Sequence, residues 1–160
     1  MTIITQERDP AFPLMHQGSR LYLLARTDIY QMNPGKGWAH GGHAATQFVF
    51  DVLDQHKGPG VPKAVASLMQ HMDEWRQQGG GGFGTKIALA LTKAEILDAV
   101  EDLAMVYGLQ TGTAVDPTYP FTNWQGDVYT AEELTGGYVF APKDTPALAL
   151  EYLRQFKLHP

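Results

Sequence analysis

Cysteine is absent from the 160-residue chain, which excludes a disulfide scaffold, a cysteine nucleophile and a thiolate zinc site. Apolar runs of about 18 or more residues are also absent, so we expect no membrane-spanning helix and no membrane partner. The chain does not begin with a basic stretch followed by an apolar one, so we expect no secretory signal. Together these absences lead us to expect a cytoplasmic protein.

Basic residues are scarce, with twelve Lys and Arg against seventeen Asp and Glu and a net charge of −5. Residues 1–80 carry seven of each sign, whereas residues 81–160 carry five basic and ten acidic residues. Proteins that coat nucleic acid need a basic face. The charge therefore argues against bulk phosphate binding and leaves room for a local basic patch in the first half.

The sequence lacks the motifs of serine hydrolases and of the common nucleotide-binding loops. Serine occurs only at Ser19 and Ser67, and neither lies in a nucleophile-elbow pattern, so we expect no serine hydrolase. The sequence contains neither a Walker loop nor a G-x-G-x-x-G motif, so nucleotide binding by those loops is not expected.

Hydrophobic residues make up 44% of the chain, and its length suits one domain. Strand-like and helix-like patterns alternate, which favours an α/β or α+β sandwich. The predicted strands are residues 20–27, 85–91, 109–115 and 137–141, and the predicted helices are 36–55, 63–78, 92–107 and 144–156.

Local signals set several boundaries. Thr92 and Glu95 have the spacing of a capping box, and Gly108 is placed to end that helix in the left-handed conformation. Asp144-Thr145-Pro146 predicts a capped start for the last helix. Residues 117–134 are expected to be irregular, and the four glycines at 79–82 are expected to form a mobile loop.

The helix expected over residues 36–55 begins with an unusual stretch. Its polar side chains share one face: Lys36, His40, His43 and Gln47. Three glycines accompany them, each weakening a helix by about 1 kcal/mol relative to alanine: Gly37, Gly41 and Gly42. Either a ligand or partner backbone approaches closely here, or the polar face is solvated and the glycines serve helix packing.

Each further candidate has an ordinary alternative. His40 and His43 form H-x-x-H, but no third ligand is identifiable, so we expect no metal site. Asp116 follows a strand and precedes Pro117, which suits either a general base or a turn. The aromatic residues of 117–134 could stack on nucleic-acid bases or form a small satellite core.

Three stretches of the chain carry a family resemblance. The first combines Arg26-Thr27-Asp28-Ile29 with Met32, Gly35-Lys36, Ala39 and His43-Ala44-Ala45. The second runs from Lys86 to Gly108-Leu109, and the third begins at Asp116 and includes the final strand and helix. Over roughly residues 20–158 the chain resembles the type 2 peptidyl-tRNA hydrolases of archaea and eukaryotes.

Several positions depart from the family pattern. His40 stands where the family has glutamine, and Pro117-Thr118 replace an Ala-Gly that is followed a little later by threonine. Ala141-Pro142 replace Gly-Pro, and two insertions centre on residues 61–83 and 119–134.

The resemblance implies a fold and an assembly. The fold is a single-domain α/β three-layer sandwich, in which a four-stranded mixed sheet has helices on both faces. The domain would span residues 19–160 after an N-terminal arm at 1–18, and family members are commonly homodimers.

The resemblance also implies an activity, namely hydrolysis of the ester between a peptide and the 3′ end of tRNA, with no cofactor and no metal. Lys36 would stabilise the oxyanion, Asp116 would orient or deprotonate water, and His40 could assist or replace Asp116 as base. His43 would position a partner or a phosphate. The expected substrate-binding residues are Thr118, Gly35, Gln47 and Arg26, and Arg26 with Asp28 would also support the loop.

Two other functions stay open. The chain could hydrolyse a smaller amino-acid or peptide conjugate of a nucleotide, or it could be a non-catalytic module that binds RNA or protein. In the enzymatic cases the partner is peptidyl-tRNA or a related nucleotide conjugate.

Overall fold

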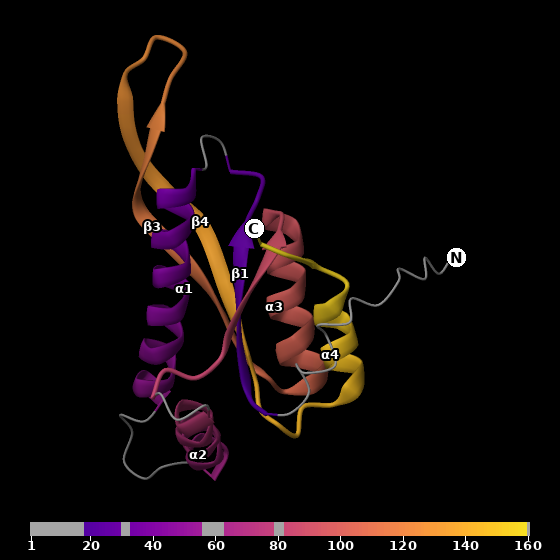
Figure 1. The fold of residues 1–160 in the computed structure, drawn as a ribbon. Helices are drawn as coiled ribbons and strands as arrows, with labels where there is room; N and C mark the ends of the chain where they lie inside the picture. Colours follow the sequence, from indigo (N-terminus) through magenta and orange to yellow (C-terminus); the bar gives the residue numbers. More distant parts are fainter. Residues whose placement is uncertain (1–17, 30–32, 56–62, 79–81, 160) are drawn as a thin grey trace, which may run out of the picture.

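A computed structural model describes residues 18–29, 33–55, 63–78 and 82–159 of the chain. Five strands and four helices occur in these residues (Figure 1). In chain order they are β1 (Arg20–Arg26), α1 (Pro34–Gln55), α2 (Lys63–Gln77), β2 (Lys86–Leu91), α3 (Lys93–Tyr107), β3 (Gln110–Thr122), β4 (Val128–Ala141), α4 (Ala147–Arg154) and β5 (Lys157–Leu158). The expected N-terminal arm, apart from Gly18, and most of the glycine loop at 79–82 lie outside the described residues.

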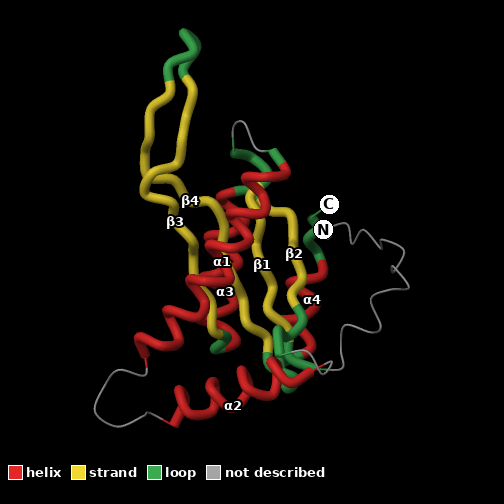
Figure 2. The backbone as a smooth tube through the Cα atoms, turned by 60° about the vertical axis from the view of Figure 1, so that its left-hand side comes forward, coloured by secondary structure: helices red, strands yellow, loops and turns green. Residues whose placement is uncertain are grey.

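The strands form one open mixed sheet in the order β3-β4-β1-β2-β5 (Figure 2). Strands β1 and β2 are parallel, and the other neighbours are antiparallel. The predicted α/β class and mixed sheet are therefore confirmed, but the predicted number of four strands is wrong. The fifth strand, β5, has two residues and pairs with Leu89 and Ala90, and two residues are too few to show a strand alternation in sequence.

Strands β3 and β4 form a long hairpin that projects beyond the rest of the molecule (Figure 1). The prediction that residues 117–134 are irregular is wrong, because β3 continues to Thr122 and β4 begins at Val128. The register shifts between Asp116 and Tyr119. Such a shift accommodates Pro117, which has no N–H for the ladder, and this explains why the sequence signals there resemble a turn.

Alternate residues of a strand point to opposite sides of a sheet, and the core divides accordingly. One hydrophobic cluster joins strand residues to α3 and α4: Tyr22, Leu24, Leu89, Ile96, Leu103 and Leu153 among others. The second joins strand residues to α1 and α2: Leu21, Tyr138, Phe140, Phe48, Val52 and Trp75. Across the residues that the structure describes, none of the helices is both long and apolar enough to cross a membrane.

Helix α3 begins and ends as its sequence predicts. Thr92 Oγ1 accepts a hydrogen bond from the Glu95 N–H, and the Glu95 carboxylate accepts one from the Thr92 N–H at 2.7 Å. Gly108 ends the helix with φ of 65°, in the left-handed region that favours glycine. The capping box and the terminating glycine are both confirmed.

Helix α4 begins differently from its prediction. Its N-cap residue is Pro146, which makes no side-chain cap hydrogen bond. The Thr145 hydroxyl donates instead to the Pro142 carbonyl at 2.7 Å. The expected polar cap at residues 144–145 is therefore wrong.

Candidate active site

The candidate site lies where α1 begins. Asn33 Oδ1 accepts a hydrogen bond from the Lys36 N–H at 3.0 Å, in the manner of an N-cap asparagine. Gly35 lies in this first turn, where a Cβ would approach Asn33 Oδ1 to 3.4 Å. The positive end of the helix dipole and the Lys36 ammonium therefore act together at this point.

Lys36 contacts a tyrosine from the hairpin. Its Nζ donates to the Tyr119 hydroxyl at 3.3 Å and lies 4.7 Å from the centre of the Tyr119 ring. Tyr119 is 1% exposed, so the hairpin carries a buried polar group directly to the start of α1. Sequence reasoning missed Tyr119 as a site residue, and the one signal that could have found it was the aromatic content of its segment.

His40 lies one turn further along α1, buried with 4% of its surface exposed. Its ring centre is 5.5 Å from that of Tyr119 and 6.2 Å from that of His43. Burial lowers the pKa of His40, and the nearby His43 and Lys36 lower it further, whereas Asp116 opposes them. His40 is therefore neutral near pH 7, and its buried Nδ1 has no hydrogen-bond partner among the described residues.

Asp116 reaches the same place from the hairpin. Its Oδ1 accepts hydrogen bonds from the Thr118 N–H at 2.8 Å and from the Thr118 hydroxyl at 3.2 Å. The Asp116 charge acts on His40. The structure thus brings together four residues from two segments, which we call the Lys36 cluster: Lys36, His40, Asp116 and Tyr119.

Arg26 is buried beside this cluster in an ion network. Its Nε donates to Asp28 Oδ1 at 2.8 Å, and one terminal nitrogen donates to the Glu133 carboxylate and, at 2.6 Å, to the Leu134 carbonyl. Burial opposes the charge of Arg26, but the hydrogen bonds to Asp28 and Glu133 outweigh it and raise the pKa of Arg26. Arg26 and Asp28, which were expected to support the loop together, form an ion pair, while the contact with Glu133, 107 residues away, was not foreseen.

Gln47 belongs to a separate polar group. Its Nε2 donates to Asp51 Oδ1 at 2.7 Å, and Asp51 Oδ2 accepts from the Tyr138 hydroxyl at 2.5 Å. Gln47 follows His40 by seven residues, which is about 10 Å of helix rise. The structure therefore does not bring Gln47 to the Lys36 cluster, although both share a helical face.

The two histidines of the H-x-x-H motif differ in their surroundings, since His40 is buried and His43 is exposed. Within the described residues, no three His, Cys, Asp or Glu side chains are grouped so that they could hold a metal ion.

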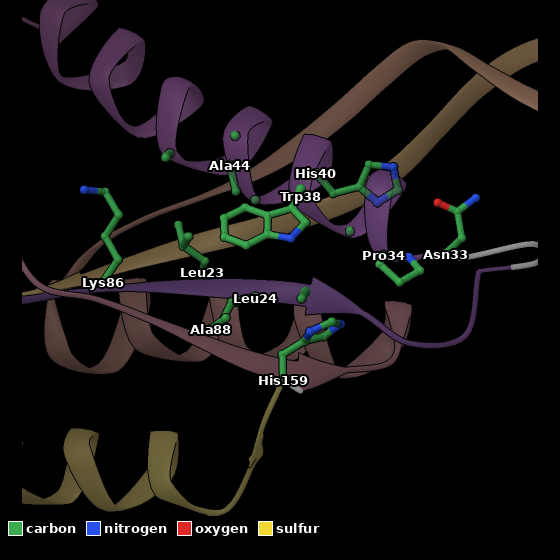
Figure 3. A pocket seen from close by; sticks show the side chains of 15 residues that line it. Leu23, Leu24, Asn33, Pro34, Trp38, His40, Ala44, Lys86, Ala88 and His159 are labelled. Atoms are coloured by element: carbon green, nitrogen blue, oxygen red, sulfur yellow. The ribbon is translucent and has the colours of Figure 1, made fainter.

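An apolar groove of about 880 Å³ adjoins the Lys36 cluster between α1 and strands β1 and β2 (Figure 3). His40 lines it, so the groove and the cluster share this residue, and Asn33, whose side chain caps the start of α1, lines it as well. A concave, mostly apolar site with a few polar groups in its lining is the usual form of a small-molecule site.

No protein-family model matches this chain, and no curated protein matches it. The assignment of the site therefore depends on its geometry. A half-buried cation, a neutral buried histidine and a carboxylate, meeting at a helix N-terminus, can together bind an oxyanion and accept a proton from water.

Proposed function

We propose that this chain hydrolyses the ester that joins a peptide or N-blocked amino acid to the 3′ ribose of tRNA, releasing free tRNA. The observation that carries the proposal is the meeting of Lys36, Tyr119 and His40 at the start of α1, with the charge of Asp116 acting on His40. The proposal includes the three-layer sandwich and the cytoplasmic setting that the sequence led us to expect.

Lys36 is the proposed oxyanion partner. When water attacks the ester carbonyl, the carbonyl oxygen gains negative charge, which the Lys36 ammonium and the helix N-terminus both stabilise. Tyr119 holds the ammonium in place through its hydroxyl and its ring face. One preorganised oxyanion donor is worth about 100- to 1000-fold in rate.

His40 and Asp116 are the candidates for activating water. A base must be unprotonated to accept the proton of the attacking water, and burial keeps His40 in that neutral form near pH 7. As the bond between carbonyl carbon and ribose oxygen breaks, the same proton passes to the ribose oxygen. The carboxylate of Asp116 favours the transiently charged histidine, because it raises the pKa of His40.

The hairpin supports binding of the nucleotide part. Tyr119 contacts Phe121 at 4.9 Å between ring centres, and Phe121 stacks on Tyr129 at 5.6 Å and 20° between planes. Tyr129 is exposed, and so is Trp124 at the hairpin turn. Exposed aromatic faces stack on bases for about 1–3 kcal/mol each, without sequence preference.

One observation favours a smaller substrate as the second candidate. Residues 110–141 contain four acidic and no basic residues, so the hairpin would repel an extended phosphate backbone. A short amino-acid or peptide conjugate of a nucleotide brings fewer phosphates and would suffer less repulsion.

The test is hydrolysis of N-acetyl-leucyl-tRNA by the purified protein, beside N-acetyl-leucyl-adenosine and with EDTA in a parallel reaction. The proposal predicts turnover that EDTA does not abolish. Faster turnover of the adenosine conjugate than of the tRNA would select the second candidate. Tight tRNA binding by folded protein without turnover of either compound would contradict both and indicate a non-catalytic binding module.

A further inference from the structure

The groove beside the Lys36 cluster is lined mainly by apolar groups. Strands β1 and β2 supply Leu23, Ala25 and Ala88, and α1 supplies Ala44, Ala45 and the indole of Trp38. Figure 3 shows the Trp38 side chain between α1 and these strands, with Lys86 at one end of the groove and Asn33 and Pro34 at the other. Trp38 is 85% exposed, so a large aromatic surface is left uncovered at the groove.

The glycines of α1 give a second, independent observation. Gly37, Gly41 and Gly42 all line the groove. A Cβ built on Gly37 or Gly41 would approach no other side chain closer than 3.9 Å, and one on Gly42 would meet nothing within 4 Å. Packing of the protein therefore does not require glycine at these positions, although each weakens the helix. Their effect is to leave the groove open.

The third observation is the position of His40. It lines the groove and contacts Tyr119, so one end of the groove opens onto the proposed reacting atoms. Its buried Nδ1 has no hydrogen-bond partner in the described part of the chain, which is a costly state for a buried polar atom.

The lining also identifies the chemistry of the occupant. Lys86 is its one residue that is always charged at neutral pH, and the Lys86 ammonium already donates to the Phe83 carbonyl at 2.7 Å and lies over the Trp75 ring. The rest of the lining is apolar apart from Asn33, His40 and His159, so it offers little charge to a phosphate or an acidic side chain. It suits a branched aliphatic or an aromatic side chain that buries apolar surface against Trp38 and Leu23.

From these observations we infer that the groove binds the acyl part of the substrate and selects apolar side chains next to the ester. This inference rests on the proposed function, since it assigns the two halves of one substrate to opposite sides of the Lys36 cluster. The nucleotide lies on the hairpin aromatics, the ester at Lys36 and His40, and the amino-acid side chain in the groove.

Binding is tested without any hydrolysis. N-acetyl-leucinamide is titrated into ¹⁵N-labelled protein, with N-acetyl-glycinamide as the matched ligand lacking the side chain. The indole N–H signal of Trp38, assigned with Trp38→Phe, should shift saturably with leucinamide, and glycinamide should bind at least about tenfold more weakly. Equal shifts for both ligands, or none, would overturn the inference.

Selectivity is tested by comparing kcat/KM for N-acetyl-leucyl-, N-acetyl-glycyl- and N-acetyl-aspartyl-tRNA. The leucyl compound should exceed the other two by about tenfold or more. Gly41→Leu fills the groove and should reduce this ratio towards one, whereas Thr46→Leu, at an exposed position of α1 outside the groove, should preserve it. Equal rates for all three side chains in the wild-type protein would overturn the inference while leaving the proposed function intact.

The two proposals fail in different ways. Leucinamide binding at Trp38 without hydrolysis of any ester would overturn the proposed function and with it the acyl role of the groove. A dimer that dissociates when Gly41 is replaced by leucine, with no leucinamide binding, would show that a second copy of the chain covers the groove and would also overturn the inference.

Discussion

The Lys36 ammonium and the Tyr119 hydroxyl lie 3.3 Å apart, although 83 residues separate them in the chain. Because the long hairpin carries Tyr119 back to the start of α1, a lysine at a helix N-terminus becomes a fixed cation with a defined direction. This contact fixes the geometry of the Lys36 cluster.

Tyr119→Phe removes the hydroxyl and keeps the ring contacts with His40 and Phe121. A hydrogen bond to a charged group is worth about 1.5–3 kcal/mol, so we expect kcat/KM for N-acetyl-aminoacyl-tRNA to fall at least about tenfold with little loss of thermal stability. Tyr152→Phe, which removes a hydroxyl that donates to Asp102 on the α3 and α4 side of the sheet, is the matched control and should retain the wild-type rate. A Tyr119→Phe enzyme as fast as wild type would show that the hydroxyl does not position Lys36.

The lowered pKa of His40 predicts the shape of the pH profile. If neutral His40 accepts the proton, kcat/KM is constant above about pH 6.5, the ordinary histidine value, and falls as the pH decreases through the lower pKa of the folded protein. His40→Gln should remove this acidic limb, because glutamine does not titrate. His43→Gln should move the limb to higher pH, because the charge of His43 lowers the pKa of His40. An unchanged limb in His40→Gln would assign the titration to another group.

Arg26→Met tests the buried ion network. It leaves the partly buried carboxylate of Glu133 and the more exposed one of Asp28 without their guanidinium, and losing hydrogen bonds to a charged group costs about 1.5–3 kcal/mol. Lys93→Met, which removes a more exposed cation from the same Glu133, should cost less than about 1 kcal/mol. Urea unfolding of the two variants measures the difference, and equal destabilisation would contradict the assignment of Arg26 as the central cation.

The same network predicts how stability depends on pH. Its hydrogen bonds outweigh the effect of burial and lower the pKa values of Asp28 and Glu133 below their ordinary 3.8 and 4.5. As the pH falls, these two carboxylates therefore take up protons in the unfolded chain before they do so in the folded protein. Their contribution to stability is present above about pH 4.5 and is lost as the pH falls through the lower pKa values of the folded protein. In Arg26→Met this acidic loss of stability should be smaller than in the wild-type protein.

Gly84 and Gly82 form a matched pair for a packing prediction. Both have positive φ, but a Cβ on Gly84 would lie 2.1 Å from the buried Trp75 ring, whereas one on Gly82 meets nothing within 4 Å. Gly82→Ala should cost about 1–2 kcal/mol from backbone strain alone. Gly84→Ala should cost at least about 2 kcal/mol more, because the Trp75 indole also donates to the Thr85 carbonyl and cannot move without losing that bond. Similar losses for both variants would contradict the close packing of α2 against this turn.

Sequence predicted best the features that neighbouring residues determine. The capping box of Thr92 and Glu95 and the terminating Gly108 depend on contacts within one helix, and both are confirmed. The arrangement of Lys36 and His40 on one face of α1 follows from helical periodicity and is likewise present.

Features that depend on distant partners were predicted poorly. Pro117 suggested a turn, because only its pairing with β4 reveals that β3 continues through an irregular register. Glu133 gave no sign of contacting Arg26, since that contact requires the sheet to form first. Gln47 shares the helical face of His40 but lies too far along the helix axis to reach the Lys36 cluster. Helical periodicity alone therefore predicted more site residues than the structure brings together.

The most direct test of the account compares wild-type protein with Lys36→Ala and Asp116→Ala in hydrolysis of N-acetyl-leucyl-tRNA, each variant shown by circular dichroism to be folded. We expect Lys36→Ala to lower kcat/KM by about 100- to 1000-fold, the value of one oxyanion donor, and Asp116→Ala to lower it substantially as well. Wild-type rates in folded Lys36→Ala would contradict the claim that the start of α1 is the reacting centre.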